Sequence, residues 1–311
     1  MSRSLALQAI NLESTDRIPN WEFLSNPDFE CALTGIDPYT HPQKSALRMV
    51  EILDLDIASV PLSDDALPPL PEDGVDAEGH RIGRWGGGTT WRWDWGAKFK
   101  TEADVLIYQP LMHMDMRESS MPVARDYRRS VAELADEFAN ELKRSQDLLG
   151  DNALSGVPGF YNTFFMWPLL TFGWDLFITT AMQYPAEMAR LMDDFGQISQ
   201  KAFSAWAEVQ PTLFVSHDDI CYTRGPVFNP KWLRRYVYPW YERLWDILHK
   251  RDVKVLFMSD GNVDDVVDDI FACGADGIMG EPYTNLEAVV QRYPEKILLG
   301  NADNRILMSG E

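Results

Sequence analysis

The chain has 311 residues, 45% of them hydrophobic, which is enough to form one large domain with a sizeable core. Its formal net charge of -20 argues against nucleic acid or an anionic membrane as a partner, because both would repel an acidic surface. Three cysteines without a C-x-x-C spacing argue against a disulfide framework and a four-cysteine zinc site. The polar N-terminus and the lack of a long apolar run predict a cytoplasmic protein.

The first half of the chain predicts strands that alternate with helices. Helices are expected over residues 4–12, 42–53 and 128–149, and strands near residues 18–24, 56–62 and 154–159. Residues 72–100 are rich in glycine and contain alternating Trp91, Trp93 and Trp95. This pattern is typical of a short β ribbon, which we expect to be inserted outside the main fold as a lid or an interface.

The second half has clearer boundaries. Helices are expected over residues 166–183, 186–208 and 230–250, the last with a kink at Pro239, and strands near residues 212–216, 254–258, 276–280 and 296–300. Seven strands separated by helices, without a G-x-G-x-x-G turn, predict a (β/α)8 barrel formed by residues 1–311 as a single domain. No sequence remains for an eighth strand, so we expect a barrel truncated before strand eight, with a gap between strands seven and one.

Polar residues follow the last four predicted strands directly. The segments are TLFVS-HDD, KVLFM-SDGN, GIMG-EP and ILLG-NAD, which contain Asp218, Asp219, Asp260, Glu281 and Asp303. Because the carboxyl ends of parallel strands face one rim, we expect these side chains to converge there. The rim is therefore the predicted site.

Four rim residues are assigned catalytic roles: His217, Asp219, Asp260 and Glu281. His217 is interpreted either as a ligand or general acid, or as a histidine that packs beneath the rim. Adjacent residues of an extended segment point in opposite directions, so only one of Asp218 and Asp219 faces the pocket, and we favour Asp219. Asp260 has the alternative of a simple Asx turn before Gly261.

Five further residues near predicted strand ends are assigned to substrate binding: Glu22, Tyr161, Asn162, Asn301 and Asp303. Glu22 has the alternative of a salt bridge with Arg17. The tryptophans at helical spacing, such as Trp206 and Trp245, are expected in the core.

Several motifs together resemble the uroporphyrinogen decarboxylase superfamily. They are DRIPNWE near the start, RIGRWGG in the ribbon, and SHDDICYTRGPVFNP, LFMSDGN, GADGIMGEP and ILLGNAD in the second half. The resemblance implies a (β/α)8 barrel. It also implies one of two activities, that of the haem-pathway decarboxylase or that of the cobalamin-dependent methyltransferases.

The motifs favour the methyltransferase branch. The decarboxylase follows its DR-x-P motif with an arginine-bearing segment that grips the acidic substrate, whereas this chain has EFLSNPDFE. The zinc-dependent thiol methylases carry H-x-C where this chain has Met258-Ser259-Asp260. The S-D-G-N and E-P motifs resemble O-demethylating relatives, which implies transfer of a methyl group between a small methylated donor and a corrinoid protein.

The rim residues allow two chemistries. Asp260 and Glu281, with His217 or Asp303, would suit a divalent cation such as zinc, whereas an unmetallated acid would protonate the leaving oxygen. Two other functions remain open: a decarboxylase of porphyrin biosynthesis, and an inactive barrel fragment or binding module. The sequence also leaves a homo-oligomer open.

Overall fold

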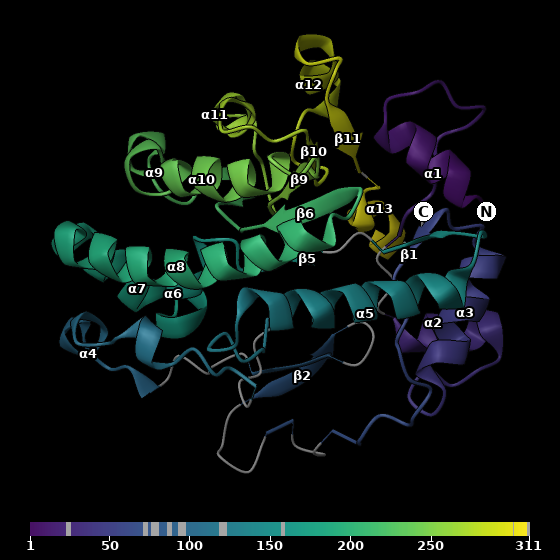
Figure 1. The fold of residues 1–311 in the computed structure, drawn as a ribbon, viewed down its shortest axis with the longest axis horizontal. Coiled ribbons are helices and arrows are strands. Elements are labelled where there is room, and N and C mark those ends of the chain that lie inside the picture. The colour runs from purple at the N-terminus through teal and green to yellow at the C-terminus, as the bar shows by residue number, and fades with distance from the viewer. Residues whose placement is uncertain are drawn as a thin grey trace.

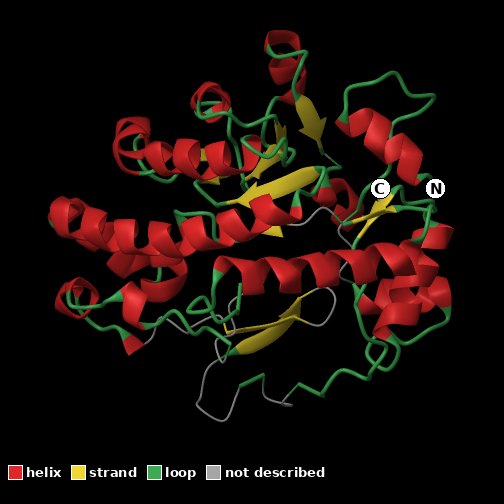
Figure 2. Ribbon diagram, in the orientation of Figure 1, coloured by secondary structure: helices red, strands yellow, loops and turns green. Residues whose placement is uncertain are grey.

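The computed structural model describes residues 1–22, 26–70, 74–75, 81–85, 89–92, 98–117, 123–156, 159–300 and 302–309. Helices alternate with parallel strands through most of the chain, which confirms an α/β fold (Figures 1 and 2). Within the described ranges, every helix is too short or too polar to span a lipid bilayer.

The helices lie mainly outside the strands (Figure 2). They are α1 (Arg3–Ile10), α2 (Pro27–Thr34), α3 (Pro42–Ile52), α4 (Glu102–Leu106), the 3-10 helix η3 (Pro110–Met112), α5 (Val131–Leu149), α6 (Met166–Phe172), α7 (Trp174–Gln183), α8 (Pro185–Val209), α9 (Pro230–Tyr236), α10 (Tyr238–His249), α11 (Val267–Ala272), α12 (Leu286–Arg292) and α13 (Asn304–Ser309).

The parallel strands form two sheets in the described part of the chain. One has the order β11 (Ile297–Leu299), β10 (Gly277–Met279), β9 (Lys254–Met258), β6 (Leu213–His217) and β5 (Gly159–Phe160). The other pairs β1 (Ile57–Ala58) with β4 (Leu154–Ser155), and Trp21 bridges to Ile57 in parallel. Spatial neighbours thus follow the chain order without a reversal, which argues against a doubly wound open sheet.

The two sheets share an apolar cluster. Its buried members are Ala6 and Ile10 of α1 together with Ile57, Leu213, Val215, Leu256 and Met279, and the partly buried Trp21, Leu154, Met258, Ile297 and Leu299 pack against them. Every parallel strand region predicted from the sequence contributes at least one side chain. The strands therefore surround one interior, although the hydrogen bonds among described residues do not join them into a continuous barrel.

A larger core lies between the five-stranded sheet and the outer helices. Trp167, Trp245 and Tyr241 are completely buried there, and Trp206 and Trp240 nearly so, which confirms the prediction that the helical tryptophans form core. Gly196 lets α8 approach α10, because a Cβ atom at this position would lie 2.5 Å from the Trp240 ring.

Several elements differ from the sequence prediction. The helix expected over residues 166–183 is divided at Gly173, whose φ of 79° is left-handed. The helix expected over residues 230–250 is divided at Val237, two residues before Pro239, because proline lacks the amide donor that a continuous helix needs. Helix α2, and a hairpin formed by β7 (Cys221–Tyr222) and β8 (Gly225–Pro226), were not predicted.

The ribbon is present as an antiparallel pair of β2 (Ile82–Trp85) and β3 (Thr89–Arg92). Trp93 and Trp95 lie outside the described residues, so the predicted aromatic face stays a prediction. After β11 the described chain contains α13 and no further strand.

Candidate active site

Three of the four predicted catalytic residues come together at the carboxyl ends of β6 and β9. His217 is the last residue of β6, and its Nε2 lies 2.9 Å from Oδ1 of Asp219. The backbone N–H of Asp260, two residues after β9, donates to the same Oδ1 at 3.0 Å. Side-chain ligand atoms of His217, Asp219 and Asp260 all lie within 4.8 Å of one another.

The adjacent carboxylates of Asp218 and Asp219 point in different directions, as the extended segment predicts. Asp218 is completely buried and accepts the N–H groups of Phe164, Phe165 and Met166 at 2.7, 2.8 and 2.9 Å. It also accepts the hydroxyl of Tyr241 at 2.9 Å. Asp218 therefore fixes the turn that leads into α6, while Asp219 faces His217.

The charges of the cluster shift its protonation equilibria. Burial alone would lower the pKa of His217, but the hydrogen bond to Asp219 and the nearby carboxylates outweigh it and raise the pKa. Burial likewise opposes ionisation of Asp219, yet the contact with His217 lowers its pKa. The carboxyl group of Asp260 reaches solvent. Its partial burial is the main cause that raises its pKa to about 6, and the negative charges of Asp219 and Glu281 add to this effect. The cluster thus holds an acid that titrates near neutral pH.

Glu281 contacts the turn that carries Asp260. It follows β10 and is half-buried, and its Oε2 accepts the N–H of Gly261 at 2.7 Å. The structure thus places Glu281 beside the cluster with one oxygen already engaged by backbone.

Tyr161 forms a wall of the cluster. Its ring meets that of His217 edge to face, with 4.3 Å between the centroids. Burial, followed by the charges of Asp219, Asp260 and Asp218, raises the pKa of Tyr161, so its hydroxyl stays protonated. The next residue, Asn162, is completely buried and its carbonyl accepts the hydroxyl of Ser199 at 3.4 Å.

The remaining predicted substrate-binding residues are not joined to the cluster by hydrogen bonds of the described chain. Glu22 is exposed, and Arg17 pairs with the buried Asp56 rather than with Glu22. Asp303 holds Arg305 through two contacts of 2.9 and 2.7 Å, and this partner lowers its pKa. Asn301 lies outside the described residues.

Two polar residues near the cluster do not cap the helices that follow them. Thr284 and Glu287 have the spacing of a capping box, but Asn285 caps α12 instead. Thr284 turns away from the helix and accepts the N–H of Val263 at 3.1 Å. Asn262, which precedes the segment VDDVVDDIF, accepts the N–H of Asp264 in a local turn, and α11 begins only at Val267.

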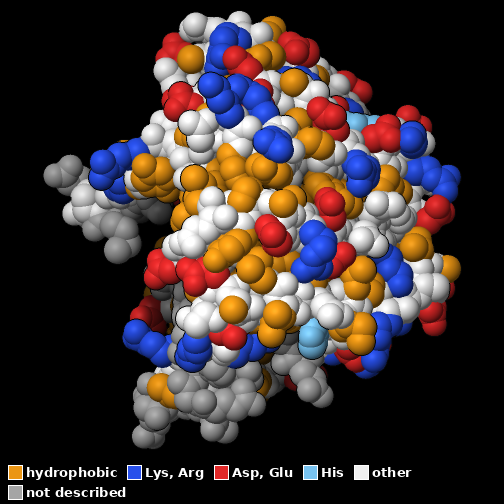
Figure 3. All heavy atoms as spheres, turned by 90° about the vertical axis from the view of Figure 1, so that its left-hand side faces the viewer, with side chains coloured by type: hydrophobic (Ala, Val, Ile, Leu, Met, Phe, Trp, Pro, Cys, Tyr) orange, Lys and Arg blue, Asp and Glu red, His pale blue; other side chains and the backbone are white. Residues whose placement is uncertain are grey.

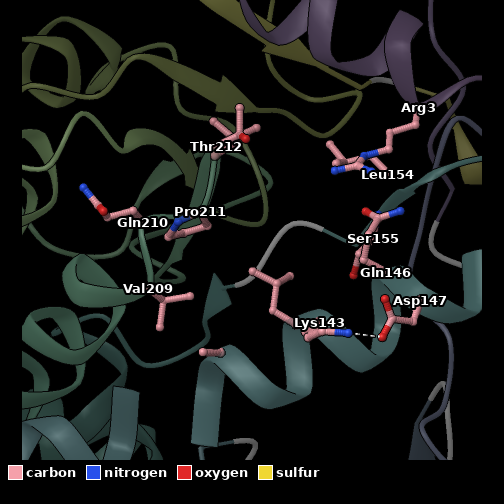
Figure 4. Close-up of a pocket in the computed structure, with 13 residues that line it drawn as sticks. Arg3, Lys143, Gln146, Asp147, Leu154, Ser155, Val209, Gln210, Pro211 and Thr212 are labelled. Carbon is pink, nitrogen blue, oxygen red and sulfur yellow. Dashed lines mark hydrogen bonds and ion pairs between the residues drawn. The ribbon is translucent and has the colours of Figure 1, made fainter. Parts of the chain in front are cut away.

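A cavity of about 360 Å³ lies at the other end of the strands (Figure 4). It is lined by the starts of β4 and β6, by α5 and by the end of α8. Lys143 in its wall is paired with Asp147, and Gln146 accepts the N–H of Ser155 at 2.9 Å. The space-filling view in Figure 3 shows the side of the molecule at the left of Figure 1, where acidic and basic side chains intermingle with apolar ones. The residues that line the cavity do not include His217, Asp219 or Asp260.

Comparisons with known proteins agree with the motifs. A family model for uroporphyrinogen decarboxylase matches residues 172–311, which include His217, Asp219, Asp260 and Glu281. The solved structure of a methyltransferase from Methanosarcina mazei is similar with a TM-score of 0.58 and 15% identity, covering 96% of this chain and 82% of that one. At this identity the likeness concerns the fold. No curated protein matches the sequence. The resemblance predicted from the motifs is confirmed over residues 172–311, which match the family model for uroporphyrinogen decarboxylase.

Proposed function

We propose that the chain is a methyltransferase that moves a methyl group between a small methylated substrate, such as an O-methyl compound, and a corrinoid protein. The observation that carries the proposal is the cluster of His217, Asp219 and Asp260, with a solvent-accessible carboxyl group whose pKa is about 6. Such an acid can protonate a leaving oxygen near neutral pH. We further interpret the strand order as that of a (β/α)8-type barrel, whose sites lie at the carboxyl ends of the strands.

In this reaction the carbon–oxygen bond of the substrate breaks and its electron pair stays on the oxygen. The corrinoid of the partner protein is the acceptor of the methyl group. Asp260 supplies the proton that the oxygen needs, and Asp219 holds the backbone of Asp260 through its N–H. The contact with Asp219 raises the pKa of His217, which favours the protonated imidazole beside the carboxylates.

Porphyrinogen decarboxylation is the weaker alternative. Its substrate carries many carboxylates and needs cationic partners. The described cluster instead offers two carboxylates and one histidine, with Glu281 adjacent. The sequence after Pro19, EFLSNPDFE, contains no arginine.

A zinc ion is the alternative to the proton donor. Nε2 of His217 and one oxygen each of Asp219 and Asp260 form a nitrogen and oxygen set of the kind that zinc accepts. Of the other predicted ligands, Glu281 accepts the N–H of Gly261 with one oxygen, and Asp303 is paired with Arg305. A bound zinc ion would supply Lewis-acid polarisation of the substrate oxygen.

Metal analysis separates the two chemistries. Purified protein is analysed for zinc before and after chelation, beside a His217→Ala variant. The proton-donor account predicts that methyl transfer persists after chelation. One zinc ion per chain, lost together with activity in His217→Ala, would instead support the metal.

The proposal is tested by a transfer assay with cob(I)alamin and a panel of O-methyl compounds, in which methylcobalamin is followed by its absorbance. Replacing Asp260→Asn removes the acid, so the rate should fall about 10²–10⁴-fold. The matched control is Asp276→Asn, because Asp276 makes a similar 2.9 Å contact with His249 at the opposite ends of the strands. The control should keep its rate. An Asp260→Asn variant with full activity would remove the proposed acid.

A further inference from the structure

The turn from Asp260 to Val263 is held by four different acceptors. Each of its four successive backbone N–H groups donates to another part of the chain. The acceptors in order are Asp219 Oδ1, Glu281 Oε2, the carbonyl of Tyr222 and Thr284 Oγ1, at 3.0, 2.7, 2.9 and 3.1 Å. The position of Asp260 is therefore set by three segments at once: the residues after β6, the β7–β8 hairpin and the loop after β10.

Gly261 is the point at which the turn is most tightly confined. Its φ is 83°, in the left-handed region, and a Cβ atom there would lie 2.4 Å from the carbonyl carbon of Tyr222. On the other side, Thr284 Oγ1 donates to the carbonyl of Gly261 at 3.2 Å. The hairpin and the loop after β10 thus both contact the peptide group between Gly261 and Asn262.

Glu281 makes the shortest of the four contacts. At 2.7 Å, the distance between Glu281 Oε2 and the nitrogen of Gly261 is at the short end of the range for N–H···O hydrogen bonds. Within the described chain, the side chains whose possible ligand atoms lie together are those of His217, Asp219 and Asp260. Glu281 is not part of this group. Its oxygen therefore acts on the backbone beside Asp260 rather than within the cluster.

We propose that Glu281 is a positioning residue, which holds the Gly261 peptide and so fixes the carboxyl group of Asp260 toward the substrate. This role rests on the proposed function, in which Asp260 donates the proton. A group that must meet a reacting atom loses much of its effect when it is misplaced by about 1 Å. Apart from the effect of its charge on the pKa of Asp260, the contribution of Glu281 should therefore depend on its oxygen as an acceptor.

Two substitutions separate these properties. Glu281→Gln keeps an oxygen that accepts the Gly261 N–H, whereas Glu281→Ala removes it. With each protein assayed at its own pH optimum, kcat of Glu281→Gln should stay within about threefold of the unchanged protein, and kcat of Glu281→Ala should fall about 100-fold with little change in KM. Glu287→Ala, in the first turn of α12, is the matched control and should leave kcat unchanged.

Amide hydrogen exchange of Gly261 provides a readout that does not depend on activity. In 15N-labelled protein, the Gly261 amide should be protected in the unchanged chain, in Glu281→Gln and in Glu287→Ala. Exchange should be at least about tenfold faster in Glu281→Ala, because its acceptor is gone. This pattern supports the contact even if no methyl transfer is found, and equal exchange in all four proteins overturns it. If Glu281→Gln loses as much activity as Glu281→Ala while Gly261 stays protected, Glu281 acts directly and the positioning role is wrong.

Discussion

Asp218 and Asp219 show how neighbouring carboxylates take different tasks. Asp218 is buried in the core and accepts hydrogen bonds from three backbone N–H groups and from the hydroxyl of Tyr241. Asp219 instead forms a hydrogen bond with His217. Complete burial raises the pKa of Asp218 to about 7, against the effect of its four donors. Its function is therefore tied to stability, and that of Asp219 to the cluster.

Removal of the Asp218 carboxylate should be costly. Asp218→Ala leaves four buried donors without an acceptor, and we expect a loss of roughly 3–5 kcal/mol in the free energy of unfolding. Tyr241→Phe removes only one of the four contacts and should cost about 1 kcal/mol. Urea unfolding monitored by circular dichroism measures both. Equal losses would show that the carboxylate is not the hub of these contacts.

The rate of methyl transfer should depend on pH through Asp260. Its pKa is raised from 3.8 to about 6, so the protonated form that donates survives at higher pH than in an ordinary aspartate. The rate should therefore be constant below pH about 5 and fall with a slope of tenfold per pH unit above about 6. Initial rates over this range measure the profile, and Asp260→Asn should remove the slope. A rate that rises through pH 6 would instead indicate a general base.

The sequence could indicate the residues of the cluster but not their contacts. His217, Asp219 and Asp260 follow strands, and strand ends of a parallel sheet share one edge, so proximity was predictable. The contact of Glu281 with Gly261 joins segments 20 residues apart through a left-handed turn, which no local pattern encodes. Asp303 looked equivalent to the others, but its neighbour Arg305 engages it locally.

At the scale of elements, helix packing depends on small residues that a sequence pattern does not single out. Strand positions were predictable because apolar runs and turns mark them. The division of helices at Gly173 and Val237 was less predictable, because it depends on how each helix packs against the rest of the core. No sequence pattern around Gly196, in the middle of α8, indicates that it packs against the ring of Trp240.

Gly196→Ala tests this packing. In an exposed helix the change would stabilise by about 1 kcal/mol, but here the new methyl group would meet ring atoms at 2.5–2.6 Å. We expect a net destabilisation of about 1–3 kcal/mol. Trp240→Phe removes the crowded part of the ring, so the double variant should lose less than the sum of the two single variants. Chemical unfolding of all four proteins gives the coupling, and strict additivity would contradict the contact.

At the scale of the whole molecule, the order of the strands was predictable and their closure was not. Alternation of strands and helices already implied parallel neighbours in chain order, and the sheets show that order. Closure depends on hydrogen bonds between segments far apart in the sequence, and the described residues form two sheets around a shared apolar cluster. The family match covers residues 172–311, which carry the cluster.

Methyl transfer is tested most directly when it is compared with porphyrinogen decarboxylation on the same purified protein. One sample receives an O-methyl compound with a labelled methyl group and cob(I)alamin, and the other receives uroporphyrinogen. We expect that label appears on the corrinoid and that no coproporphyrinogen forms. Formation of coproporphyrinogen without any labelled corrinoid would contradict this expectation.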